Sequence, residues 1–200
     1  MAVPLFTRTW GESGRRILLL HGLTWNTDAW WRLAPDLAER GWEVTAVDLR
    51  GHGRTPGGGD YRLESSTADV LETVGEGWDA VLGHSLGGAL AVIAQTSRPG
   101  FARRIVLEDP ALLMAAVGTE EAVRWLTEPY DRPMTIEATA EANPSWDPED
   151  VRLKVEALRA CSREVVEATV RDNPDWNLIA ETAALTIPTA MIGGDPEHGG

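Results

Sequence analysis

The sequence contains little cysteine and no excess of positive charge. Cys161 is the only cysteine among 200 residues, which excludes an intrachain disulfide and fits a reducing compartment. The net charge of −13 makes nucleic acids and anionic membrane surfaces poor partners. The first residues lack the apolar core of a signal peptide, and no apolar run approaches the length of a membrane span. We therefore expect a cytoplasmic globular protein that binds neither nucleic acid nor membrane.

Motifs for nucleotides and metals are also missing. The glycine-rich segment over 83–88 is not followed by the Lys-Ser or Lys-Thr pair of a phosphate-binding loop. The segment over 48–53 begins like a dinucleotide fingerprint, but Pro56 stands where the third glycine belongs. The four histidines show no i,i+4 spacing and no paired carboxylates. We expect no metal and no cofactor.

A serine between glycines stands at a predicted corner between a strand and a helix. The segment is Gly83-His84-Ser85-Leu86-Gly87-Gly88, with an apolar strand over 78–82 before it and helix-forming residues over 89–95 after it. So tight a turn requires glycine, and it places the serine in strained geometry at a helix N-terminus, where developing negative charge is favoured. Ser85 could instead be only the N-cap of a helix in a glycine-rich turn. The strand–turn–helix context favours a nucleophile.

A second functional loop is predicted where the apolar strand over 17–20 ends in His21-Gly22. Acyl transfer by a serine nucleophile requires two backbone N–H groups directed at the developing oxyanion. One is expected from Leu86, directly after the serine. The other is expected from Leu23 or Thr24, after the bend at Gly22.

Three motifs together resemble one known family. They are His21-Gly22, Asp48-Leu49-Arg50-Gly51-His52-Gly53 and the segment over 83–88, in that order. In this order and spacing they resemble the serine hydrolases of the α/β-hydrolase fold, over essentially the whole chain. The resemblance implies a mostly parallel central sheet with helices on both faces, and the alternation of predicted strands and helices indicates the same α/β class. The predicted elements include an edge strand over 3–10 and a helix that is capped by Asp147 and begins at Pro148. Serine at residue 85 argues against relatives with aspartate there, the haloalkane dehalogenases and epoxide hydrolases.

The resemblance also implies a helical cap above the site. From Asp109-Pro110 to about Thr186 the chain has helix signals and no strand-like run. We expect a core over 1–109, a cap over 110–185, and a core strand with the acid loop over 186–200. Tryptophans of the cap could line an acyl pocket or pack its helices onto the core, and both interpretations remain open. The predicted substrate pocket comprises Thr24, Trp25, His84, Trp125 and Trp146.

The catalytic acid of this family follows the penultimate core strand, which the pattern over 187–192 predicts here. Asp195 is therefore the expected acid, which would orient the catalytic histidine and stabilise its charged form. The spacing keeps Glu197 as an alternative. Asp109 is a third candidate because some members take the acid from the preceding strand, although a helix cap beside Pro110 is the simpler interpretation.

None of the four histidines is a convincing catalytic base. His21 and His52 belong to motifs that organise loops in the family, and His84 points elsewhere in the turn geometry. His198 lies only three residues from Asp195 and is a weak substitute. The family order of serine, acid and histidine leads us to expect the base beyond Gly200, with the last strand and final helix, and to expect the chain as given to be inactive and poorly stable.

The expected activity is hydrolysis of a carboxylic ester or related acyl substrate through an acyl-enzyme on Ser85, with water as the second substrate. Lactones, thioesters, amides and the carbon–carbon bonds of diketones are further possibilities, as is cofactor-free haloperoxidase activity. The alternative from another class is a non-catalytic protein of the same fold that binds small molecules. The sequence does not indicate an oligomeric state.

Overall fold

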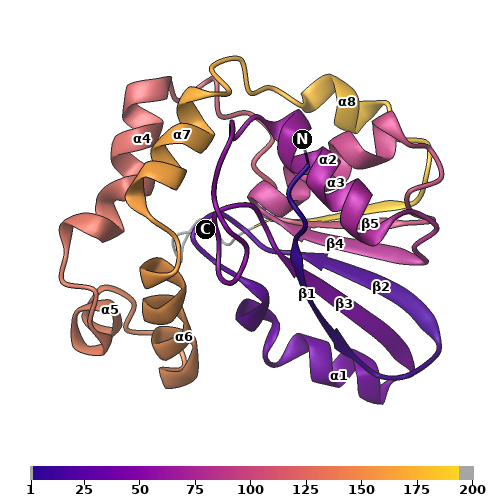
Figure 1. The fold of residues 1–200 in the computed structure, drawn as a ribbon, viewed down its shortest axis with the longest axis horizontal. Coiled ribbons are helices and arrows are strands. Elements are labelled where there is room, and N and C mark those ends of the chain that lie inside the picture. The colour runs from indigo at the N-terminus through magenta and orange to yellow at the C-terminus, as the bar shows by residue number, and fades with distance from the viewer. Residues whose placement is uncertain (1, 194–200) are drawn as a thin grey trace.

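Six strands form a single sheet in this computed structural model, which describes residues 2–193. The strand order is β1-β3-β2-β4-β5-β6 (Figure 1). β1 is antiparallel to β3, and every other neighbouring pair is parallel. The strands are β1 (Phe6–Trp10), β2 (Arg15–Leu20), β3 (Trp42–Asp48), β4 (Ala80–His84), β5 (Ile105–Glu108) and β6 (Thr189–Ile192).

Helices cover both faces of this sheet. In Figure 1, α1 lies below the sheet against β3, while α2 and α3 pack on each other above it. This arrangement confirms the α/β class and the mostly parallel sheet with helices on both faces. The helices next to the sheet are η1 (a 3-10 turn, Thr27–Trp30), α1 (Leu33–Glu39), α2 (Leu63–Val74), α3 (Leu86–Ser97) and α8 (Ile179–Ala183).

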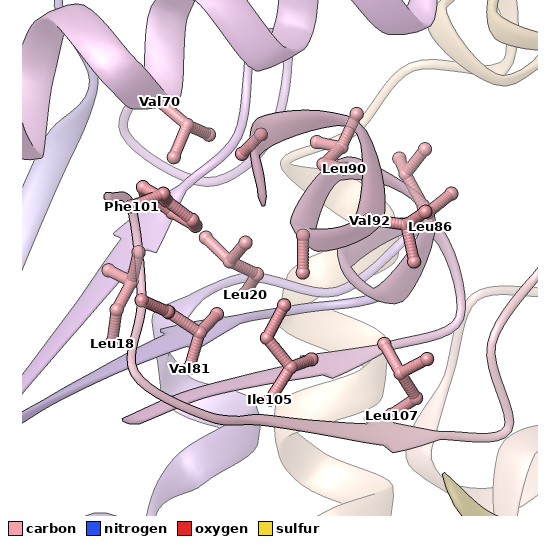
Figure 2. Packing of buried hydrophobic residues seen from close by; sticks show 14 of the residues in the cluster. Leu18, Leu20, Val70, Val81, Leu86, Leu90, Val92, Phe101, Ile105 and Leu107 are labelled. Atoms are coloured by element: carbon pink, nitrogen blue, oxygen red, sulfur yellow. The ribbon is translucent and has the colours of Figure 1, made fainter. Parts of the chain in front are cut away.

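The central strand β2 contributes apolar side chains to both faces of the sheet. Leu18 and Leu20 belong to the core cluster under α2 and α3, together with Leu90 of α3 (Figure 2). Ile17 and Leu19 belong to the cluster on the α1 side. Because successive strand residues point to opposite faces, a strand buried on both sides must be apolar throughout, as this one is. Each fully buried leucine contributes roughly 1.5–3 kcal/mol.

A second group of helices lies beside the sheet, at the left of Figure 1. We call α4 to α7 with η2 the outer helices (residues 119–171). Within this group α4 packs on α7, α5 packs on α6, and α6 reaches η1 of the core. Asp147 caps α6 as the sequence predicts, with its carboxylate accepting a hydrogen bond from Glu149 N at 2.8 Å. The group comprises α4 (Thr119–Thr127), η2 (Glu128–Asp131), α5 (Ile136–Ala142), α6 (Pro148–Arg159) and α7 (Arg163–Arg171).

The boundaries of the predicted cap over 110–185 remain a prediction. The last helix in that range, α8, contacts α3 of the core and not the outer helices. No helix among residues 2–193 is both long and apolar enough to cross a membrane.

The first strand is shorter than the sequence suggests. The pattern predicts an edge strand from residue 3, but β1 begins at Phe6. The N–H of Val3 donates to Asp69 Oδ1 at 2.6 Å, and the N–H of Leu5 donates to Thr73 Oγ1 at 3.1 Å. Side chains of α2 thus bind the backbone that a strand would have paired.

Candidate active site

Three non-glycine residues of the described chain have positive φ angles. They are Thr24 at 64°, Ser85 at 48° and Asp109 at 39°. They follow β2, β4 and β5, which are adjacent parallel strands, so all three lie at the carboxyl edge of the sheet. A strained backbone of this kind costs about 1–3 kcal/mol per residue and concentrates at functional sites. This edge is also where ligands bind in open α/β sheets.

Ser85 connects β4 to the first turn of α3. Its N–H donates to the carbonyl of Glu108 at 3.0 Å, and its carbonyl accepts from the N–H of Gly88 at 3.0 Å. Ser85 occupies the N-cap position of α3, but its hydroxyl does not cap the helix by a hydrogen bond.

The loop after β2 lies directly against the turn that carries Ser85. A Cβ atom at residue 22 would lie 2.6 Å from Nδ1 of His84 and 3.2 Å from Cβ of Ser85. A Cβ atom at residue 87 would overlap the carbonyl of Leu20 at the end of β2. Glycine is required at both positions because the two loops approach so closely.

The two backbone segments predicted to form an oxyanion hole lie on these two loops. Leu86 is the first residue of α3, where N–H groups have no partner within the helix. Leu23 and Thr24 are the central residues of a turn closed by a hydrogen bond from Trp25 N to Gly22 O at 3.1 Å. The structure thus places the three expected donor residues at the same edge of the sheet as Ser85.

His21 and His52 organise loops. His21 Nδ1 donates to the carbonyl of Gly22 at 2.8 Å, while its Nε2 accepts from the N–H of Leu49 at 2.9 Å. His52 Nδ1 donates to the carbonyl of Arg50 at 2.9 Å. Burial lowers the pKa of His21 and brings the pKa of His52 down to about 4, so both rings are neutral. Neither ring is hydrogen-bonded to Ser85, and Nε2 of His52 is buried without a partner among the described residues.

His84 precedes Ser85 and stands opposite Glu108 in the pairing of β4 with β5. Burial lowers the pKa of His84, and the carboxylates of Glu108 and Asp109 oppose that shift. No hydrogen bond joins Ser85 to a histidine within residues 2–193.

Two cavities adjoin this edge. A cleft of about 550 Å³, here called the sheet-edge cleft, is lined by His84, Glu108, Trp25 and Trp146 among others. A cavity of about 370 Å³ among the outer helices, here called the outer cavity, is lined by Trp146 and Lys154 with several apolar side chains. Trp146 lines both, and its ring lies 6.0 Å from the ring of Trp25.

Three of the five predicted pocket residues line the sheet-edge cleft, namely Trp25, His84 and Trp146. Thr24 lines neither cavity but is bonded to Lys154, which lines the outer cavity. The structure does not bring Trp125 to either cavity, because α4 buries Ala122 and Val123 and leaves Trp125 64% exposed. The pocket prediction is corrected at that residue.

Three other tryptophans lie either in the core or in the wall of the sheet-edge cleft. Trp176 packs in the core, and its Nε1 donates to the carbonyl of Ala111 at 2.7 Å. Trp30 and Trp31 line the sheet-edge cleft, which the sequence did not predict.

The candidate acids fall into two groups. Asp195 and Glu197 lie outside the described residues, as does His198. Asp109 lies at the site edge, and the interpretation that it caps a helix beside Pro110 is wrong, since the next helix begins only at Thr119.

Lys154 is a site residue that sequence reasoning missed. Its Nζ donates to Thr24 Oγ1 at 2.6 Å, across 130 positions of the chain. One signal was present: it is the only lysine in the sequence. Within residues 2–193, no group of three or more His, Cys, Asp or Glu side chains is arranged to hold a metal ion.

A parallel sheet with a strained serine between β4 and α3 defines a class of protein, the α/β hydrolases. The family model described as alpha/beta hydrolase fold matches residues 15–152, and the chain belongs to this family.

Individual relatives are lipases and esterases. The chain is 35% identical over 151 residues to lipase LipV of Mycobacterium tuberculosis, covering 73% of this chain and 57% of that protein. It is 38% identical over 91 residues to the pimeloyl-[acyl-carrier protein] methyl ester esterase of Sodalis glossinidius, covering 44% of this chain and 34% of that protein. The chain thus spans from about a third to just over half the length of these relatives.

Solved structures share the fold. An esterase from Exiguobacterium antarcticum superposes with a TM-score of 0.76 at 19% identity, covering 94% of this chain and 75% of that one. The enol-lactonase from Burkholderia xenovorans gives a TM-score of 0.75 at 22% identity, covering 98% of this chain and 82% of that one. At these identities the likeness shows the fold alone.

Proposed function

We propose that the whole protein is a serine hydrolase of carboxylic esters, with Ser85 as its nucleophile. The observation that carries the proposal is the conformation of Ser85. Its φ angle is strained at 48°, and its side chain forms no capping hydrogen bond at the N-terminus of α3. This geometry leaves the hydroxyl without a hydrogen bond to the helix and favours negative charge beside it. The lipase and esterase relatives support an acyl substrate, with water as the second reactant.

The proposed mechanism proceeds in two acyl transfers. Ser85 Oγ attacks the ester carbonyl, and the N–H groups of Leu86 and Leu23 hold the oxyanion. The alcohol leaves, and water then releases the acyl group from Ser85. The proton of Ser85 passes to a histidine other than His21 or His52, whose ring nitrogens hold loops together.

The acid that orients this histidine is proposed to be Asp195, with Glu197 and Asp109 as alternatives. Asp109 gains support from its strained φ of 39° beside the site, because strain of this kind accompanies functional residues. Replacement of each carboxylate by its amide in the full-length protein separates the three, since only the true acid lowers kcat by orders of magnitude.

Covalent labelling tests the nucleophile. The full-length protein is treated with a fluorophosphonate probe, which reacts with activated serines, as wild type, Ser85→Ala and Ser97→Ala. Ser97 belongs to the same helix, and its hydroxyl only donates to the carbonyls of Ile93 and Ala94. We expect labelling of wild type and Ser97→Ala, and none of Ser85→Ala.

Two results would contradict the proposal. Labelling that persists in Ser85→Ala would assign the nucleophile elsewhere. A folded full-length protein that is neither labelled nor active on esters would favour the non-catalytic binding protein.

A further inference from the structure

Lys154 of α6 joins the outer helices to the loop after β2. Its Nζ donates to Thr24 Oγ1 at 2.6 Å and to the carbonyl of Thr24 at 3.3 Å. The same Nζ lies 4.4 Å from the ring centre of Trp25. An ammonium ion is thereby held next to the loop that carries the expected donor Leu23.

The charge of Lys154 has no carboxylate partner among the described residues. Arginines of the chain do have such partners, for example Arg50 with Asp69 and Arg152 with Glu149. Burial lowers the pKa of Lys154 to about 7, with only the thiol of Cys161 opposing the shift. A buried cation without a counter-charge is costly, and the cost falls when an anion binds beside it.

The positive charge of Lys154 extends to the edge where Ser85 lies. Burial is the main cause that lowers the pKa of His21, His52 and His84, and the charge of Lys154 adds to it at all three rings. A protein with a net charge of −13 thus has an uncompensated positive charge at its candidate site. This favours an anionic ligand over a neutral one.

The outer cavity gives such a ligand a place. Lys154 lines it together with Trp146, which also lines the sheet-edge cleft. Its wall further contains Met134 and Leu158, which suit an aliphatic chain. Arg132 also lines this cavity, but its charge is paired with Glu128. Of the two cationic side chains that line the outer cavity, Lys154 is therefore the one without a carboxylate partner among the described residues.

We propose that Lys154 binds a carboxylate on the acyl part of the substrate, so that the enzyme prefers half-esters of dicarboxylic acids. The inference rests on the proposed function of Ser85. With a pKa of about 7, Lys154 is only partly charged near neutral pH, and a bound carboxylate favours its charged form. The ammonium has three donor protons, and the two bonds to Thr24 leave one for the substrate. A hydrogen bond between two charged groups is about twice as strong as one between neutral groups.

Matched ester pairs test this preference in the full-length protein. The monomethyl esters of succinate, adipate and suberate are compared with methyl butyrate, hexanoate and octanoate, because each pair differs only in the terminal carboxylate. The measured quantity is the ratio of kcat/KM for the acidic ester to that for the neutral one. Wild type is compared with Lys154→Met and Lys154→Arg. The control for loss of a cation from the same helix is Arg152→Met, because Arg152 pairs with Glu149 and Glu156 at the surface.

We expect the ratio for the best pair to fall about 10- to 100-fold in Lys154→Met, the loss of one hydrogen bond between charged groups. Lys154→Arg should retain part of the ratio, and Arg152→Met should retain all of it. Thermal melting confirms that each variant is folded. An equal loss on both members of every pair, or an unchanged ratio, would overturn the inference, because Lys154 would then act only through Thr24.

A binding measurement separates this inference from the proposed function. Monomethyl adipate is titrated into Ser85→Ala and into Ser85→Ala with Lys154→Met, so that no catalysis is required. We expect the Kd to rise about 10- to 100-fold on loss of the lysine. Equal affinity would refute the role of Lys154 even if Ser85 is the nucleophile. Hydrolysis of methyl hexanoate that disappears in Ser85→Ala would support Ser85 whatever Lys154 does.

Discussion

Each of the three strained residues at the carboxyl edge is held by specific hydrogen bonds. Ser85 is bonded through its N–H to Glu108 of the neighbouring strand at 3.0 Å. Thr24 is held by Lys154 of α6, and the N–H of Asp109 donates to the carbonyl of Ile192 at 2.7 Å. A positive φ angle persists in a non-glycine residue only when its surroundings enforce it. The backbone conformations of these three residues therefore depend on their hydrogen-bond partners as well as on the residue types.

Gly22→Ala tests how closely the two loops must approach. The added methyl group would lie 2.6 Å from His84 Nδ1 and 3.2 Å from Ser85 Cβ, so one loop must move. Because a displacement of about 1 Å can cost on the order of 100-fold in rate, we expect kcat/KM on a neutral methyl ester to fall by about that factor. The control is Gly100→Ala, where the nearest atom to an added Cβ is Oε2 of the exposed Glu76 side chain at 3.3 Å. A Gly22→Ala enzyme with wild-type kcat/KM would show that the loops do not constrain the chemistry.

At the scale of elements, a buried ion pair fixes the segment between β3 and α2. Arg50 donates to both carboxylate oxygens of Asp69 at 2.7 and 2.8 Å, and the two side chains are 4% and 1% exposed. Asp69 also accepts from the N–H of Val3, so α2, the loop after β3 and the N-terminal segment meet at one carboxylate. Such a pair specifies one arrangement of three segments, since breaking it leaves a buried charge alone.

Asp69→Asn is therefore expected to destabilise the protein by about 3–5 kcal/mol, because Arg50 loses its buried counter-charge. The free energy of unfolding is measured by urea denaturation at pH 7. Glu76→Gln breaks the exposed pair with Arg98 and is the control, with an expected change of less than about 1 kcal/mol. Equal changes in the two variants would contradict the structural role assigned to the Arg50–Asp69 pair.

At the scale of the whole molecule, neutral histidines make stability depend on pH. His52 is buried and its pKa is about 4, below the ordinary value near 6.5. Between these two values the unfolded chain binds a proton that the folded protein does not bind. The stability contributed by the neutral ring is thus present above pH 6.5 and is lost as the pH falls toward 4. The lowered pKa of His21 acts in the same direction.

We expect His52 alone to account for a loss of about 3 kcal/mol in unfolding free energy from pH 6.5 to pH 4. Urea denaturation of wild type and His52→Gln at pH 7, 5.5 and 4.5 measures it. The variant should show a weaker pH dependence and a lower stability at pH 7, because the ring no longer fills its place. Parallel curves for the two proteins would mean that other groups cause the acid sensitivity.

Most of the core could be predicted from the sequence because its signals are local. The apolar run over 17–20, the glycines over 83–88 and the cap at Asp147 each act within a few residues of chain, and the structure has β2, the turn at Ser85 and α6 there. The prediction was wrong at residues 3–5 because the partners of that backbone, Asp69 and Thr73, lie in another helix. Trp125 was misplaced because helical content does not reveal which face of α4 is buried.

By itself the sequence determined the class of protein: a mostly parallel sheet with helices on both faces and a serine in a tight turn between strand and helix. Residue type and spacing suffice for that, since periodicity and turn chemistry are properties of short segments. Only the tertiary structure decided which distant groups meet at the carboxyl edge. The bond from Lys154 to Thr24 joins segments separated by 130 positions, and no motif of the sequence predicted it. Contacts across such separations depend on how helices pack on the sheet, and no local pattern encodes that packing.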